Sequence, residues 1–201
     1  SVSAAAEKVL PKKDEKTETG APKEKTISKK IKDIQKAIVE GDLGGLLEAI
    51  GGKRRFEDPM TTVIANTFNK LLYKFPINTT VKFGQVEENR DGKYDPATNT
   101  ITIQGSETEG YTGKRELDQV AMHEISHATL DHVLDNPGEY IKSLPAEKRP
   151  EAQAALNRLL QNYKVVKSKF GSKYDIGTIK EFAAEFWSNP KLQQDLALMP
   201  S

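Results

Sequence analysis

The chain has 201 residues, of which 36% are hydrophobic and 29% charged, so it is long enough for one domain with a sizeable core. Its formal net charge of +1 gives no overall field that favours nucleic acid or an anionic membrane surface. It contains no cysteine, which excludes disulfide bonds, thiolate metal ligands and a cysteine nucleophile.

The N-terminal quarter of the chain divides into two predicted segments. Residues 1–26 are rich in Lys, Glu, Ala, Thr and Pro and almost lack large apolar residues, so we expect a disordered tail or linker. Residues 27–54 predict a helical N-terminal segment, in which the stretch 27–40 carries lysines opposite one apolar stripe. The stripe consists of Ile27, Ile31, Ile34 and Ile38. Residues 55–201 are then expected to form the main domain.

The main domain is expected to begin with one helix and a few strands. Asp58-Pro59 is typical of a helix start, with Asp as the N-cap and Pro at the first helical position, and this helix is predicted to run to about Tyr73. Residues 79–86 predict a strand. Residues 92–94 and 99–104 flank a turn that contains proline, which predicts a hairpin.

Helical patterns then continue to the end of the chain. The first predicted helix, residues 115–134, is expected to stop before Asn136-Pro137-Gly138. Three further helices are predicted over 147–170, 176–187 and 191–198. A few strands preceded by helices and followed only by helices indicate an α+β fold with a mostly helical C-terminal half.

All three histidines of the chain lie within the stretch VAMHEISHATLDH, and two of them form the pattern His123-Glu124-x-x-His127. On a helix, positions i and i+4 share one face, so both imidazoles can bind one ion. Glu124 lies beside them, where its carboxylate can reach a water in the open position of that ion. It can take a proton as the water attacks a carbonyl and return the proton to the leaving amine.

The apolar residues around this motif predict a buried helix. Two histidines and a glutamate are costly to bury unless something pairs with them, and a metal ion satisfies all three. The alternative is an exposed polar helix face that binds nothing.

His132 is a less suitable third ligand. The metzincin pattern HExxHxxGxxH requires Gly at position 130 and His at position 133, whereas this chain has Leu130 and Val133. On a continuing helix His132 points away from the histidine pair. We expect a surface histidine near the helix end, where its protonated form is favoured.

A later helix offers acidic ligands in EFAAEFWSNPKLQ. Glu181 and Glu185 lie one turn apart among apolar residues, so one can bind the ion while the other accepts a hydrogen bond from a ligating histidine. The alternative is a pair of solvent-facing glutamates. Asp131, one turn after His127, is another candidate partner for a ligating histidine, although an exposed acid is the expected state.

These motifs resemble those of the zinc metallopeptidases that combine HExxH with a downstream Glu, the gluzincin-like group. The chain is similar to the small zincin domains of phage and mobile-element proteins, including ImmA/IrrE-like peptidases and the metallopeptidase domains of large polyvalent phage proteins. Three stretches carry the resemblance: YDPATNTITI, AMHEISHATL and EFAAEFWSNPKLQ.

The resemblance implies a zincin-like fold, with a small twisted sheet, a central HExxH helix and a downstream helix that bears the glutamate. It implies one Zn²⁺ per chain held by His123, His127 and Glu181, with Glu124 as general base and Glu185 as outer partner or alternative ligand. An edge strand beside the cleft would hold an extended substrate by strand addition. The residue that stabilises the transition state stays open among Tyr140, Tyr163 and Tyr174.

Two functions follow from this reading. The first is a zinc-dependent endopeptidase that acts on a protein or peptide, in the cytoplasm of a bacterial host or associated with a virion. The alternative is a catalytically silent module, such as a virion or injected component, in which zinc only stabilises the fold. We expect no nucleic-acid partner, because the lysines of residues 12–32 alternate with acids, and no membrane span, because no apolar run approaches roughly 20 residues.

Overall fold

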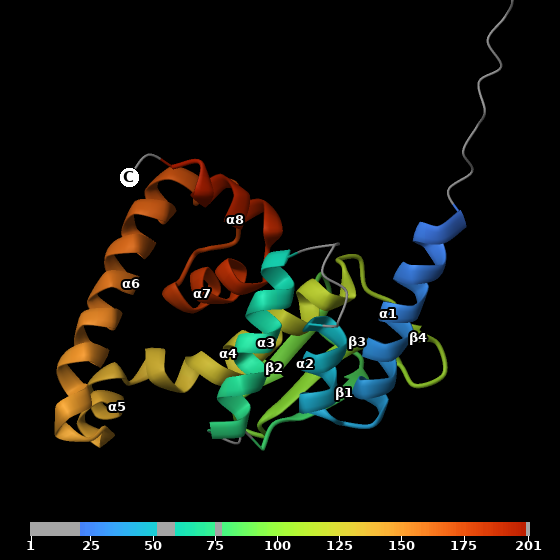
Figure 1. Cartoon of the computed structure of the whole chain (residues 1–201), viewed down its shortest axis with the longest axis horizontal. Coiled ribbons are helices and arrows are strands. Elements are labelled where there is room, and N and C mark those ends of the chain that lie inside the picture. Colours follow the sequence, from blue (N-terminus) through green and yellow to red (C-terminus); the bar gives the residue numbers. More distant parts are fainter. Residues whose placement is uncertain (1–20, 52–58, 75–77, 200–201) are drawn as a thin grey trace, which may run out of the picture.

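The computed structural model describes residues 21–51, 59–74 and 78–199 (Figure 1). Within them the chain forms an α+β fold of eight α-helices and a small mixed sheet of four strands, with a mostly helical C-terminal half, as expected. The predicted tail over 1–20 and the predicted N-cap Asp58 lie outside the described residues.

The sheet is built around its longest strand. The four strands are β1 (Thr80–Gly84), β2 (Gly92–Asp95), β3 (Thr100–Ser106) and β4 (Gly110–Tyr111). Strand β3 pairs in parallel with β1 on one side and antiparallel with β2 on the other, while its end pairs with β4. The predicted hairpin is β2–β3, and Ile101 and Ile103 point into the core from β3. The two-residue β4 gave no strand signal in the sequence.

Three helices precede the sheet and the others follow it. They are α1 (Ala21–Val39), α2 (Leu43–Gly51), α3 (Pro59–Lys74), α4 (Leu117–Asp135), α5 (Pro137–Ser143), α6 (Arg149–Phe170), α7 (Ile179–Ser188) and α8 (Pro190–Ala197), with a short 3₁₀ turn at Ala146–Lys148. Helix α1 begins six residues before the predicted stripe, so part of the predicted tail is helical. The Asn136-Pro137 pair ends α4 as predicted but also begins α5, because proline fits the first turn of a helix.

One hydrophobic core joins the N-terminal helices, the sheet and the motif helix. Its fully buried side chains include Ile34, Leu46, Leu47, Ile101, Ile103, Met122 and Ile125. The first part of α4 is enclosed by this core, since nine of the twelve residues from Leu117 to Ala128 are buried. No residue after Ala128 in α4 is fully buried, so the second half of this helix extends beyond the core.

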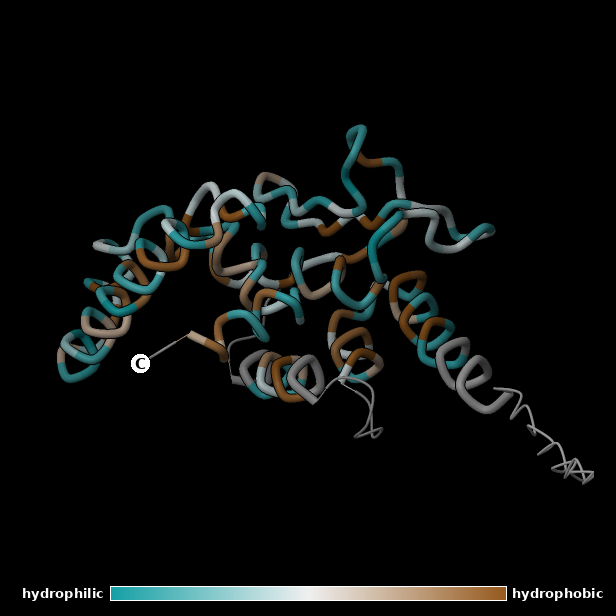
Figure 2. The backbone as a smooth tube through the Cα atoms, turned by 90° about the horizontal axis from the view of Figure 1, so that it is seen from above, coloured by the Kyte–Doolittle hydropathy of each residue, from teal (hydrophilic) through white to brown (hydrophobic). Residues whose placement is uncertain are grey.

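Helix α7 connects the main core to a smaller apolar cluster. Helix α7 packs on α4, and its two alanines, Ala183 and Ala184, are buried. The smaller cluster packs α7 with α6 and α8 through Val166, Ile176, Phe182 and Leu192. In Figure 1 the long α6 forms one end of the molecule and α1 the other, and Figure 2 shows hydrophilic and hydrophobic stretches alternating along the helices. No helix in the described ranges is long and apolar enough to span a bilayer.

The buried alanine of α7 gives a test of this packing. Ala184→Leu adds three carbons to a side chain that is 1% exposed, so we expect it to destabilise the fold by about 1–3 kcal/mol and to push α7 away from α4. Urea unfolding measures the change. Ala154→Leu, on the exposed side of α6, is the matched control and should have little effect. Equal stabilities of the two variants would contradict close α4–α7 packing.

Candidate metal centre

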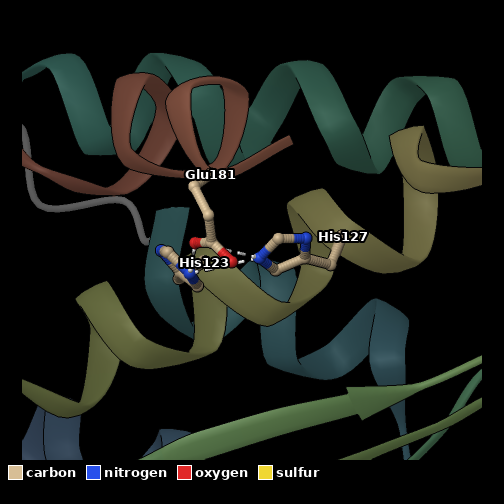
Figure 3. A group of neighbouring side chains, drawn as sticks. All are labelled: His123, His127 and Glu181. Atoms are coloured by element: carbon tan, nitrogen blue, oxygen red, sulfur yellow. Dashed lines mark hydrogen bonds and ion pairs between the residues drawn. The ribbon is translucent and has the colours of Figure 1, made fainter. Parts of the chain in front are cut away.

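Three side chains from α4 and α7 meet at one point (Figure 3). The Nε2 atoms of His123 and His127 lie 3.2 Å apart. Oε2 of Glu181 lies 3.3 Å from Nε2 of His123 and 3.6 Å from Nε2 of His127. The structure therefore brings together the three side chains that the sequence analysis named as ligands, close enough to hold one metal ion.

The spacing of these three atoms fits a tetrahedral ion. Ligand atoms about 2.0–2.1 Å from a tetrahedral centre lie about 3.3–3.4 Å from one another. The three measured separations fall close to that value. Three protein ligands leave a fourth tetrahedral position open, as in catalytic rather than structural sites.

Local structure explains how Glu181 reaches the histidines. Thr178 is the N-cap of α7, and its hydroxyl accepts a hydrogen bond from the backbone N–H of Glu181 at 3.1 Å. Thr178-x-x-Glu181 is the sequence of a capping box, in which the glutamate usually turns back to the N-cap. Here the carboxylate of Glu181 is directed at the two imidazoles instead.

The Nδ1 atom of each histidine contacts a carboxylate. Nδ1 of His127 lies 3.0 Å from Oδ1 of Asp131, and Nδ1 of His123 lies 3.4 Å from Oε1 of Glu185. These contacts leave both Nε2 atoms facing the centre, because an imidazole that donates from Nδ1 presents its lone pair at Nε2. The expectation that Asp131 would be an exposed acid is wrong, since its side chain is only 18% exposed and contacts His127.

Glu185 is itself fixed by two further residues. Nη2 of Arg115 donates to its Oε1 at 3.2 Å, and Nδ2 of Asn189 donates to its Oε2 at 2.6 Å. Asn189 is also the N-cap of α8. The asparagine of the Asn-Pro pair therefore both caps a helix and binds a carboxylate of the site. Burial would raise the pKa of Glu185, but hydrogen bonds from His123 and Asn189 outweigh it and lower that pKa.

Glu124 lies beside the histidines but differs from the other carboxylates of the site. It is buried, 7% exposed, and forms no hydrogen bond or ion pair with a side chain among the described residues. Strand β2 approaches it so closely that a Cβ at Gly92 would lie 2.8 Å from Cγ of Glu124. Burial raises the pKa of Glu124, against the opposing effect of the two histidines. Gly92 positions this carboxylate, and the sequence gave no signal of that role.

The protonation of the other three groups reflects their mutual contacts. Burial alone would lower the pKa of His127, but hydrogen bonds to Asp131 and Glu181 raise it to about 10. The pKa of His123 is also raised, because its bonds to Glu181 and Glu185 outweigh burial. Hydrogen bonds from both histidines hold the pKa of Glu181 well below its usual range. The pocket therefore attracts positive charge.

The charges of the site fit a divalent cation. Four carboxylates gather here (Glu124, Asp131, Glu181 and Glu185), and two basic side chains contact them (Arg115 and Lys180). With neutral imidazoles, these four carboxylates and two basic side chains together carry a net charge of −2, which one divalent ion cancels. Buried charge without such compensation is costly, so the donor set fits a metal ion.

The centre lies in an open cleft of about 550 Å³. One wall is the β1–β2 loop and β2, and the other is α7 with the loop before it. None of the three tyrosines proposed as transition-state stabilisers lines this cleft. The hydroxyl of Tyr163 donates to the backbone carbonyl of Gly177, and that of Tyr174 donates to the carboxylate of Asp195. The ring of Tyr140 packs on His132. Three basic residues do line it, Arg90, Arg115 and Lys180, and the sequence gave no signal that they would meet there.

His132 lies outside the centre, as expected. It is exposed in the last turn of α4, and its ring packs edge-on against Tyr140 with centroids 6.3 Å apart. It is not part of the group of side chains that can share an ion.

Comparison of the chain with protein-family models, curated proteins and solved structures gives no match. The α+β fold and the His–His–Glu cluster are therefore the basis on which its function is argued.

The raised histidine pKa values predict the pH dependence of metal binding. At pH 7 His127, with a pKa of about 10, carries a proton in the metal-free protein, and an ion must displace it. Affinity for Zn²⁺ should therefore rise with pH between 6 and 9, by about tenfold per unit for each proton displaced. Titration calorimetry in two buffers of different ionisation enthalpy measures the proton release. Equal affinities at pH 6 and pH 8 would be evidence against these contacts.

The close approach of β2 to Glu124 predicts the effect of a single methyl group. In Gly92→Ala the new Cβ would lie 2.8 Å from Cγ of Glu124 and 2.8 Å from Cγ1 of Val120, so strand and helix must separate. We expect a loss of stability of about 1–3 kcal/mol, measured by urea unfolding. Gly138→Ala is the control, because a Cβ there meets nothing within 4 Å. If both substitutions are neutral, the strand is not packed on Glu124 as described.

Proposed function

We propose that the protein is a zinc-dependent endopeptidase whose general base is Glu124. The observation that carries the proposal is the triad of His123, His127 and Glu181 at tetrahedral spacing, with a separate carboxylate beside it in an open cleft. A purely structural ion needs neither the open position nor the additional acid.

Zinc fits the donor set better than Mg²⁺ or Ca²⁺. Two imidazoles and one carboxylate form the ligand group of several catalytic zinc sites, whereas Mg²⁺ and Ca²⁺ prefer oxygen ligands alone. When bound, zinc would supply a Lewis acid that polarises the substrate carbonyl and lowers the pKa of water.

The chain's own residues supply the proton transfers. The Glu124 carboxylate takes a proton from the attacking water and delivers it to the nitrogen of the leaving amine. Burial raises the pKa of Glu124, which suits a group that must both accept and return a proton near neutral pH. The other carboxylates of the site already contact histidines, so Glu124 is the one available for this task.

An extended polypeptide is the substrate that suits the cleft. In the described residues β2 is the last strand of the order β1-β3-β2 and pairs only with β3, and Gly92 and Tyr94 of β2 line the cleft. A peptide that adds to the other edge of β2 would cross the metal centre and place a backbone carbonyl there. The proposal includes the location implied by the resemblance, in a bacterial host's cytoplasm or with a virion.

Two substitutions test the proposal. Glu124→Gln should keep about one zinc per chain, measured by elemental mass spectrometry, and should lose cleavage by about 10²-fold or more, because only the proton transfer is removed. Glu181→Ala should lose the zinc as well. Cleavage is read as new peptide termini in a mixture of unfolded proteins, analysed by mass spectrometry.

Controls separate the two functional hypotheses. His132→Gln, at a histidine outside the centre, should keep both zinc and activity. The role of Glu124 is refuted if the wild type binds zinc and Glu124→Gln has the same cleavage activity as the wild type, whether both cleave or neither does. In that case the silent interaction module is favoured, and removing zinc should lower the melting temperature without affecting any cleavage.

A further inference from the structure

Lys180 connects the two helices that carry the metal ligands. It precedes Glu181 on α7, and its side chain reaches α4. Its Nζ donates to Oδ1 of Asp135 at 2.8 Å and lies 3.6 Å from Oδ2 of Asp131. Asp131 in turn contacts Nδ1 of His127 through its other oxygen, Oδ1, at 3.0 Å. A continuous chain of contacts therefore runs from α7 through Lys180 and Asp131 to a ligand on α4.

This chain of contacts lies where the core gives no support. The buried part of α4 ends at Ala128, and none of residues 129–135 is fully buried. His127, Asp131 and Asp135 thus lie at or beyond the edge of the core. Apolar packing fixes His123, whereas the position of His127 relative to α7 depends more on polar contacts.

The ion pair also differs from an ordinary surface pair. Side-chain exposures are 32% for Lys180, 18% for Asp131 and 54% for Asp135, and one ammonium group contacts both acids on successive turns of α4. A useful comparison is Lys142 with Glu139, at 2.9 Å within α5, where the side chains are 74% and 76% exposed. Such exposed pairs contribute little, because water and salt screen them.

We propose that Lys180 is a positioning residue for the metal centre. By binding Asp135 and Asp131 it fixes the first turn of α7, which bears Glu181, against the exposed half of α4, and it orients Asp131 toward His127. The ligands from the two helices then form one preorganised site. This inference rests on the proposed metal centre, but it concerns contacts that exist in the metal-free protein.

The experiment compares Lys180→Met, which keeps the stem and removes the charge, with Lys180→Arg and with the control Lys142→Met. Zinc affinity is measured by competition with a chelator of known affinity. We expect Lys180→Met to weaken it about tenfold or more, the size of effect seen for groups that orient metal ligands. Lys180→Arg should restore most of the affinity, and Lys142→Met should leave it unchanged.

Two readouts distinguish positioning from general stabilisation. The melting temperature of metal-free Lys180→Met should match that of Lys142→Met. Asp135→Asn, which does not alter Asp131, should also weaken zinc binding, and it should add little to Lys180→Met because both remove the same contact. Unchanged zinc affinity in Lys180→Met, or a loss explained by a lower metal-free melting temperature, would overturn the proposal.

A measurement without metal separates this inference from the proposed function. In the metal-free protein, proton NMR should detect the His127 Nδ1–H that is bonded to Asp131. In the wild type and in Lys180→Arg this proton should exchange slowly with solvent, so that its signal is visible. In Lys180→Met it should exchange quickly, so that its signal is lost. If the wild type binds no zinc, the proposed function fails, yet loss of this signal in Lys180→Met still supports the positioning role. A signal that persists in Lys180→Met refutes that role.

Discussion

The packing of α7 on α4 is the contact on which the candidate metal centre depends. Two of its side chains come from α4 and the third from α7, so the distance between the helices sets the distances from Glu181 to the two histidines. Those distances are 3.3 Å and 3.6 Å, and a shift of about 1 Å would exceed what a tetrahedral ion tolerates. The buried Ala184 lies on the same side of α7 as Glu181 and Glu185 and permits this approach, because a larger side chain there would keep the helices apart.

The cost of burying charge explains the rest of the arrangement. Glu185 is 5% exposed, and such a carboxylate is tolerated only when its oxygens are bonded. It is bonded on both sides, by His123 and Arg115 at one oxygen and by Asn189 at the other. Glu124 has no side-chain partner in the described part of the chain, only a backbone hydrogen bond from Tyr94, and burial raises its pKa. The fold thus gives neighbouring carboxylates different chemistry through different contacts.

Sequence reasoning succeeded where a single element determines the outcome. The i, i+4 spacing of His123 and His127 and the amphipathic pattern of the Glu181 helix are local properties, and both were predicted. Arg115, Asp131 and Gly92 were missed or misjudged, because their roles depend on which elements meet in space. An aspartate on a helix shows no sign in the sequence that a lysine from another helix will cover it. The two-residue β4 was missed for a similar reason, since its pairing with β3 rather than local periodicity supports it. Helix α5 was missed because Asn136-Pro137 was interpreted only as a helix end, although proline also fits a helix start.

The position of the centre at the edge of the core balances rigidity against access. The apolar first half of α4 holds His123 and Glu124 among buried side chains, which limits their motion. The second half leaves the core, so His127 borders an open cleft that a polypeptide can enter. A centre placed wholly in the core would be rigid but closed, and one placed beyond it would be open but poorly ordered. At the boundary, polar contacts such as those of Asp131 must supply the order that apolar packing no longer gives.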